Sequence, residues 1–330
     1  NTNNKQYIWT AIRRPDLLVA SEISGASNMF AIDTGNSSTT TPSFDAGFPV
    51  DFVLSKEYDD GSESWNVSAR LMPFTQLRTD SDDDESTNSG NSFDSLTGWG
   101  MSSDFDSNYI SYMWRRSQGL DVNVYLGNGD SGRRVNHQLN AVPEMVWIKC
   151  KDDNSTDWIV YHKGLNGGTN PHTHYIVLNS DAEEVDSTNA WNDTAPTSTA
   201  IYVGGWANVN EDNKNYLCVA FRSVDGVSKC GSYTGDGTTN GSKEITLGFA
   251  PKLLIIKGID NGIHHWAVFD TTRGFGAGVA CNYLRLNTTV DSSNVGDGVI
   301  EKSSTSFTVG CNGTSALNSN GREHIYYAHA

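Results

Sequence analysis

The chain repeats itself at a spacing of 108 residues, and this feature constrains the fold most. Several short segments recur in the same order at that spacing, which chance does not produce. A repeat of this length is a structural unit in its own right. The sequence therefore predicts two equivalent units, at 120–227 and 228–330. The matching pairs are VYLGNG (124–129) with SYTGDG (232–237), VPEMVWIK (142–149) with APKLLIIK (250–257), DWIVYH (157–162) with HWAVFD (265–270), and YIVLN (175–179) with YLRLN (283–287).

An earlier copy is looser. FPVDFVLSK at 48–56 matches the strand that follows the recurring proline, and YISYMWRR at 109–116 matches the last strand of the unit. These matches predict a divergent third unit over 15–119. YIWTAIRR at 7–14 also matches that last strand, so residues 1–14 are predicted to hold the closing strand of a preceding repeat.

Each copy has the features of antiparallel β structure. Short apolar runs such as KLLIIK are rich in β-branched residues and suit buried strands. Asp-, Asn- and Gly-rich turns separate them, and no stretch keeps a helical period over three turns. We therefore predict an all-β fold of tandem antiparallel β-sandwich-like repeats. The residues expected to be structural in the core of each repeat are Trp65, Trp158, Trp266, Pro49, Pro143 and Pro251.

The charge of the chain argues against two classes of partner. The formal net charge is −16 and the pI is about 4.7. An acidic surface repels nucleic acid and anionic lipid. No apolar run approaches the roughly 20 residues that span a bilayer, so membrane insertion is not expected. Reduced thiols are predicted for the cysteines, which show no CxxC spacing and suit a reducing cytoplasm; they are Cys150, Cys218, Cys230, Cys281 and Cys311.

No catalytic or metal constellation stands out. GNGDSG at 127–132 fits a dinucleotide-binding pattern, but no helix follows to hold a pyrophosphate, so a turn is favoured. The acidic run 80–86 could hold calcium, but it lacks the ligand spacing of an EF-hand. A solvated loop is the favoured interpretation. We expect no enzyme activity, no cofactor and no metal. The histidines considered as transition-metal ligands, without a third ligand fixed by the sequence, are His172, His174, His264 and His265.

Three tryptophans do not recur, and these are the candidate binding residues. Trp99, Trp191 and Trp206 lie in segments rich in Gly, Asn and Asp. A tryptophan in such a loop can stack on the apolar face of a sugar while neighbouring polar groups bind hydroxyls. The alternative is that each ring folds back over a small core.

The order of motifs resembles that of tail-fibre-type repeat proteins of marine tailed bacteriophages. The motifs include AIRRP, FAIDTGN, GWG, YMWRR, VNHQL, GVSKCGSYTGDG, DTTRGFG and IYYAHA, and they extend over nearly all of residues 7 to 330. The resemblance implies a virion appendage component with lectin-like β-sandwich repeats, assembled in the bacterial host cytoplasm. It supplies no catalytic residues.

The expected function is attachment to a host-surface receptor, and the expected receptor is a glycan. The expected partners are other virion proteins and further copies of the chain, in a homotrimer, because thin repeats gain stability by assembling. A purely architectural role, as a collar, shaft or capsid decoration, is the alternative. A polysaccharide depolymerase is the less favoured third possibility, because no carboxylate pair is singled out by the sequence.

Overall fold

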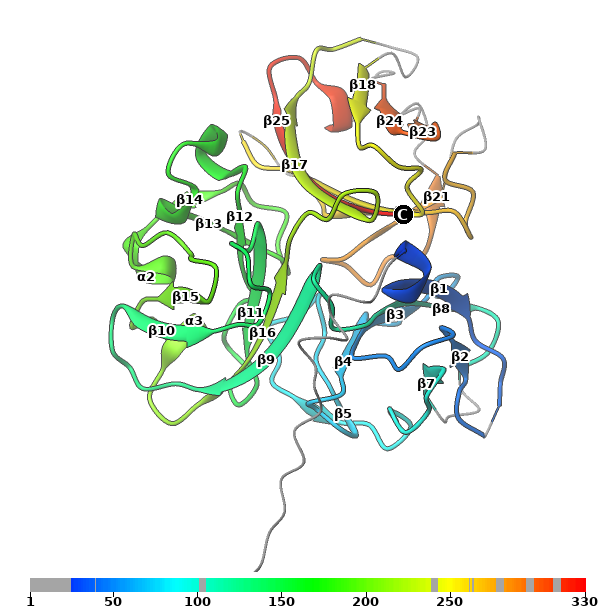
Figure 1. Ribbon diagram of the computed structural model, residues 1–330, viewed down its shortest axis with the longest axis horizontal. Coiled ribbons are helices and arrows are strands. Elements are labelled where there is room, and N and C mark those ends of the chain that lie inside the picture. Colours follow the sequence, from blue (N-terminus) through cyan, green and yellow to red (C-terminus); the bar gives the residue numbers. More distant parts are fainter. Residues whose placement is uncertain are drawn as a thin grey trace, which may run out of the picture.

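Three β units surround a common centre in the computed structural model (Figure 1). We call the described parts of 15–119, 120–227 and 228–330 unit 1, unit 2 and unit 3. The predicted strand at 7–14 lies outside the described residues. The structure describes residues 25–38, 40–100, 105–238, 243–260, 262, 264–276, 282–294, 300–310 and 316–330.

Units 2 and 3 each contain a six-stranded antiparallel sheet with the same strand order. The order is β9-β16-β11-β12-β13-β14 in unit 2 and β17-β25-β19-β20-β21-β22 in unit 3. Each strand of unit 3 begins 108 residues after its counterpart in unit 2. In unit 2 the bounds are β9 (Leu120–Leu126), β11 (Met145–Cys150), β12 (Ile159–His162), β13 (His174–Val177), β14 (Val185–Asp186) and β16 (Asn215–Phe221). In unit 3 they are β17 (Ser228–Thr234), β19 (Leu253–Gly258), β20 (Ala267–Asp270), β21 (Asn282–Arg285), β22 (Ser293–Asn294) and β25 (Glu323–His329).

Unit 1 follows the same order in a looser form. Its sheet is β1-β8-β3-β4, and a bridge between Val67 and Leu77 joins it to the hairpin β5-β6. The six strands of this unit therefore take the same sequence of neighbours as those of units 2 and 3. They are β1 (Phe30–Thr34), β3 (Phe52–Glu57), β4 (Asn66–Ala69), β5 (Thr75–Gln76), β6 (Ser86–Thr87) and β8 (Tyr109–Trp114).

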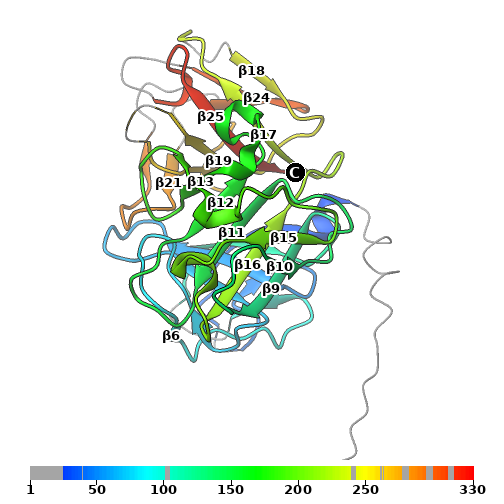
Figure 2. The ribbon, with the colours of Figure 1, turned by 90° about the vertical axis from the view of Figure 1, so that its left-hand side faces the viewer.

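A small second layer covers the outer face of each main sheet, which makes each unit a sandwich. In unit 2 this layer is the β10-β15 ribbon, which Figure 2 shows in front of the main sheet. The layer strands are β2 (Phe44–Asp45), β7 (Gly98–Trp99), β10 (Arg133–Asn136), β15 (Ala200–Val203), β18 (Lys243–Thr246), β23 (Ile300–Lys302) and β24 (Ser306–Val309). The described helices are short: η1 (Ala26–Asn28), η2 (Leu165–Gly168), η3 (Pro171–Thr173), α2 (Thr188–Trp191), α3 (Ala207–Asn210) and η4 (Ala316–Asn318). The predicted all-β sandwich fold is confirmed.

The pleat of each central strand divides its side chains between two cores. In β11, Met145 and Trp147 point to the centre of the molecule, whereas Val146 and Ile148 point to the outer core of unit 2. The central core is shared by all three units, and its aromatic rings meet across them. The ring centroids of Phe221 and Tyr327, from units 2 and 3, are 5.1 Å apart.

The recurring tryptophans link the units into a closed ring. Each indole N–H donates to a main-chain carbonyl of the neighbouring unit, always in the same rotational sense. Unit 2 thus binds unit 1, unit 3 binds unit 2, and unit 1 binds unit 3. The three Nε1–O bonds are Trp158 to Arg78 at 2.7 Å, Trp266 to Val177 at 3.0 Å and Trp65 to Arg285 at 2.8 Å.

Two further sets of bonds follow the same cycle. A fully buried lysine at the end of each central strand donates to a loop carbonyl of the neighbouring unit. These Nζ–O bonds are Lys149 to Asp82 at 3.1 Å, Lys257 to Ala182 at 2.8 Å and Lys56 to Thr289 at 2.9 Å. Main-chain N–H groups donate in the opposite direction: Glu85 to Lys151 at 2.8 Å, Glu184 to Ile259 at 2.9 Å and Ser292 to Tyr58 at 2.7 Å.

The interface between units 3 and 1 also contains a buried ion pair. Asp270 and Arg273 form a salt bridge in which both side chains are almost fully buried. The hydroxyl of Tyr112, in unit 1, donates to Asp270 Oδ2 at 2.8 Å. Burial raises the pKa of Tyr112 well above its usual value, so this hydroxyl keeps its proton.

Candidate functional site

The residues predicted to be structural are buried or half-buried in the structure. Trp65, Trp158 and Trp266 are at most 2% exposed. Pro143 and Pro251 are buried and Pro49 is half-buried, each two residues or more before a central strand. Of the cysteines that the structure describes, Cys150, Cys218 and Cys230 are buried free thiols.

Two of the three candidate sugar-stacking tryptophans are buried, which corrects the expectation for them. Trp99 is fully buried in β7, stacked between Phe44 and Phe93, and its Nε1 donates to Ser111 Oγ at 2.8 Å. Trp191 is 3% exposed at the end of α2. Neither ring offers a free face on which a pyranose could stack. Small outer cores between each main sheet and its ribbon take up these side chains.

Trp206 is half-buried, so part of its ring remains accessible. It precedes α3 and packs on Tyr175 of β13, with ring centroids 5.4 Å apart. Of the three candidates it alone keeps the partial exposure that stacking requires.

A polar cleft of about 820 Å³ lies on the surface of unit 2. It contains two arginines and two aspartates, together with amides and turn backbone. Such a lining offers both donors and acceptors at close spacing, as sugar hydroxyls require. The lining residues are Leu126, Gly127, Asn128, Asp130, Ser131, Gly132, Arg133, Arg134, Asp212 and Asn213.

A buried asparagine holds the turn that forms one wall of this cleft. Asn210 is fully buried, and its Nδ2 donates to Asn128 Oδ1 at 3.0 Å and to the Asp130 carbonyl at 2.8 Å. Its Oδ1 accepts from the Asn128 main-chain N–H. The glycine-rich pattern at 127–132 is thus a clamped turn. Gly127 is required there, because a Cβ would lie 1.9 Å from the Glu211 carbonyl oxygen.

The charged side chains of the cleft are held by neighbours and keep free hydrogen-bonding groups. The guanidinium of Arg133 lies 5.2 Å from the ring centroid of Tyr125. Arg134 is exposed, and one of its nitrogens donates to Thr199 Oγ1 at 3.1 Å. Since an arginine has five N–H donors, most of those of Arg134 remain available to a ligand.

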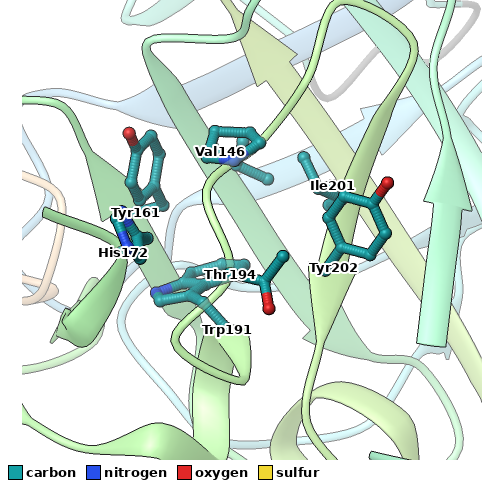
Figure 3. A pocket seen from close by; sticks show the side chains of 8 residues that line it. Val146, Tyr161, His172, Trp191, Thr194, Ile201 and Tyr202 are labelled. Carbon is teal, nitrogen blue, oxygen red and sulfur yellow. The ribbon is translucent and has the colours of Figure 1, made fainter. Parts of the chain in front are cut away.

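An aromatic pocket adjoins the cleft. In Figure 3, Tyr161, His172 and Trp191 lie on one side of this pocket and Ile201 and Tyr202 on the other. Its cavity of about 10 Å³ has room for about one water molecule. The two features are close, because a Cβ on Gly132 of the cleft would lie 3.1 Å from Nδ2 of Asn192, the residue after Trp191. The remaining lining residues are Val146, Thr194 and Pro196.

A family model described as a domain of unknown function, DUF7483, matches residues 114–330. The chain belongs to the DUF7483 family. The DUF7483 match starts at the last residue of β8 and contains units 2 and 3 whole, so the cleft and the pocket both lie inside it. No curated protein and no solved structure matches the chain.

The histidines of the DUF7483 range do not form one cluster. His172 belongs to η3 and lines the pocket, whereas His174 begins β13 and pairs through Nδ1 with Thr173 Oγ1. The two residues therefore do not lie on one strand. His264 and His265 lie in unit 3; burial lowers the pKa of His264 to about 4, and His265 pairs with Asn287.

One acidic group outside the DUF7483 range brings its carboxylates together. Glu57, at the end of β3, and Asp60 and Glu63, in the segment that follows it, have carboxylate oxygens within 4.8 Å of one another. Two of the three are exposed, and acidic turns of this kind are common without an ion, so we assign no metal to them. In the run 80–86, Asp80 instead accepts from the Trp65 main-chain N–H. No helix among the described residues is long and apolar enough to cross a membrane.

Sequence reasoning missed most of the cleft. It identified 127–132 as a turn but gave no role to Arg133, Arg134, Asp212 or Asn213. The two halves of the cleft are about 80 residues apart, and the clamp through Asn210 joins them. A signal was present: Asn210 recurs as Asn318 at the same 108-residue spacing, and Asn318 clamps the turn at Asp236 in the same way.

Proposed function

We propose that this chain is a bacteriophage virion appendage protein of the tail-fibre type, which attaches to a host-surface glycan through unit 2. The single observation that carries the proposal is the polar cleft of unit 2 with the aromatic pocket beside it. The order of motifs along the chain, which resembles tail-fibre-type proteins, supplies the biological setting.

The chemistry of the cleft suits a sugar better than an apolar ligand. Asp130 and Asp212 offer acceptors, while Arg134 and the amides of Asn128 and Asn213 offer donors. Pairs of hydroxyls on a pyranose both donate and accept, so a mixed lining of this kind satisfies them. The two arginines and two aspartates balance in charge, which allows neutral as well as charged sugars.

The ring leaves unit 2 free to specialise. Residues at the 108-residue spacing are committed to the sheets and to the interfaces between units. The cleft adds residues that differ between units to a turn that recurs: the first two residues of β10 are Arg133 and Arg134, whereas those of the corresponding β18 are Lys243 and Glu244. Variable loops on a rigid scaffold are the usual place for specificity.

An architectural role without receptor binding is the second candidate, and the closed ring favours it. Three units tied by buried lysines and tryptophans make a stable block that could serve in a collar, shaft or decoration. A depolymerase is a third outcome. Each makes a different prediction for the same experiment.

The test is retention of the purified chain on immobilised surface polysaccharide from the host. Arg134→Ala should lower the apparent affinity at least about fivefold, because an exposed charged donor is lost from the cleft. The control is Lys243→Ala, at the first position of the corresponding ribbon strand of unit 3, which should bind as wild type does. Equal thermal unfolding of both variants shows that the fold is intact.

No retention of the wild-type chain would point to the architectural role. Retention that Arg134→Ala leaves unchanged would remove the cleft as the site. Release of reducing ends from the polysaccharide would identify a depolymerase.

A further inference from the structure

Two arginines of the cleft carry positive charge that the described residues do not neutralise. Arg133 and Arg134 begin β10 and line the cleft, and neither forms an ion pair with a residue that the structure describes. Carboxylates are plentiful in a chain with a net charge of −16, so ion-pair partners for two surface arginines are easy to supply. The cleft therefore presents positive charge that a ligand can pair with.

The corresponding ribbon of unit 3 is neutralised within the protein. β18 has the same burial pattern as β10, so its first two residues, Lys243 and Glu244, correspond to the two arginines. Lys243 Nζ lies 3.9 Å from Oδ2 of Asp236, in the clamped turn of that unit. The residue 108 positions before Asp236 is Asn128, which has no charge. Unit 2 thus lacks the acid that pairs with the ribbon cation in unit 3, and it has a second cation where unit 3 has an acid.

Arg133 is held in place with most of its hydrogen-bond donors unused. Its guanidinium lies 5.2 Å from the ring centroid of Tyr125, a cation–π contact that fixes its position. One nitrogen, Nη1, donates to Oδ1 of Asn210 at 3.3 Å. A guanidinium has five N–H donors, and this side chain is only half-buried. Several donors of Arg133 are therefore available to an acceptor in the cleft.

The two aspartates of the cleft lie on the loops and do not pair with the arginines. Asp130 Oδ2 accepts from Nδ2 of Asn128 at 3.0 Å, and Asp212 Oδ2 accepts from Nδ2 of Asn213 at 2.7 Å. Each carboxylate keeps lone pairs for a further donor. A ligand can therefore meet acceptors on the loops and cations on the ribbon.

We propose that the cleft binds an acidic sugar, whose carboxylate pairs with Arg133 while Arg134 adds a second positive charge to the same site. The fork of an arginine matches the two oxygens of a carboxylate, and such bonds are stronger than those between neutral groups. Hydroxyls of the same sugar donate to Asp130 and Asp212. A phosphate on a sugar has the same chemistry toward a guanidinium, so the experiment includes one. This inference rests on the proposed glycan-binding function and names the class of sugar.

The test measures the affinity of the whole chain for methyl glucuronide and for methyl glucoside by NMR titration. These two sugars differ in one group, which is a carboxylate in the first and a hydroxymethyl in the second. The glucuronide should bind at least about tenfold more tightly, the range for a hydrogen bond to a charged group. This preference should shrink as salt is added, because salt screens exposed charges.

Variants of Arg133 separate recognition of the charge from damage to the fold. Arg133→Gln removes the charge, so it should abolish the preference while the affinity for the glucoside changes little. Arg133→Lys retains the charge without the fork and should keep part of the preference. The control is Lys243→Gln in unit 3, which should show the wild-type preference. A variant that misfolds would lose affinity for both sugars together, so the ratio of the two affinities is the readout.

Several results would overturn the inference. Equal affinities for the two glycosides, binding of neither, or a preference that survives Arg133→Gln would show that the cleft does not recognise a carboxylate. Tighter binding of glucose 6-phosphate than of methyl glucuronide would assign the cleft to sugar phosphates. Equally effective competition by inorganic phosphate alone would reduce it to a general anion site. Retention on host polysaccharide is measured in parallel: if it persists in these cases, the glycan-binding function stands and only the sugar class is wrong.

Discussion

The indole Nε1 of Trp158 donates a 2.7 Å hydrogen bond to the main-chain carbonyl of Arg78, which lies 80 residues earlier in the chain and in a different sheet. The equivalent bonds of Trp266 and Trp65 complete a cycle through all three units. The recurring tryptophan thus has two roles: its ring fills the core, and its N–H binds its unit to the neighbouring unit. This ring of three units forms within a single chain. The predicted homotrimer would be an assembly of three such chains, and it stays a prediction.

Trp158→Phe should separate these two roles. The ring volume is largely kept, but the Arg78 carbonyl loses its partner in a buried setting, which costs about 1–3 kcal/mol. Trp158→Ala should cost about 3–5 kcal/mol, since a cavity is added. The free energy of unfolding from urea titration measures both. Trp206→Phe, at a half-buried position, is the control; a loss for it as large as that for Trp158→Phe would argue against the tie.

The ring should lose stability in acid through its buried histidines. Burial lowers the pKa of His162 and of His329 to about 3, from an ordinary value of 6.5. Below pH 6.5 these histidines are protonated in the unfolded chain but stay neutral in the folded chain. The free energy of unfolding therefore falls as the pH drops from 6.5 toward 3.

His162→Gln should reduce that acid dependence, because glutamine does not titrate and can still pair with the Tyr326 carbonyl that His162 Nε2 contacts. The slope of unfolding free energy against pH between 6 and 4 should shrink by up to one proton. His174→Gln, at a half-buried position, is the control. Identical slopes for wild type and His162→Gln would show that His162 is not a source of the effect.

Lys257 should make the stability of the chain depend on pH above neutrality. Burial lowers its pKa to about 7, from 10.5. Between these values the unfolded chain holds a proton that the folded chain has lost, so stability should rise with pH from about 7 to about 10.5. Lys257→Met should lack this rise when unfolding is measured at pH 7, 8, 9 and 10. Parallel curves for wild type and variant would contradict the shift.

Variants of Asn210 and Asn318 should distinguish an effect on folding from an effect on binding. Each clamps the turn after the first strand of its unit, so Asn210→Ala and Asn318→Ala should destabilise the chain by a similar amount, about 1–3 kcal/mol. Asn210 alone supports the cleft, so only Asn210→Ala should weaken retention on host polysaccharide. Equal retention of the two variants would mean that the clamped turn of unit 2 does not form the site.

Much of the fold could be predicted because the residues that form one strand are neighbours in the sequence. The 108-residue spacing fixes which segments are equivalent, and apolar runs such as KLLIIK identify the central strands. The ring could not be predicted, because nothing in the sequence near Trp158 indicates a carbonyl at Arg78. Trp99 and Trp191 were misplaced for a related reason: the outer core forms only once distant ribbons such as β10-β15 pair over the main sheet.

The candidate site was harder still. Turn chemistry identified the wall at 127–132, since glycine and asparagine favour turns by themselves. The opposite wall at Asp212 and Asn213 reaches it through the pairing of β9 with β16, in which Leu126 lies opposite Asn215, and through the clamp of Asn210. A single sequence carries the first kind of information and not the second.

We propose that unit 2 alone binds the ligand, on a ring that all three units build. Hydrogen–deuterium exchange of the whole chain, with and without host-surface polysaccharide, tests it most directly. We predict slower exchange on binding in 127–134 and 188–213, and unchanged exchange in the equivalent turn and ribbon of unit 3 at 235–238 and 243–246. Protection that falls equally on units 2 and 3, or that appears in neither, would contradict it.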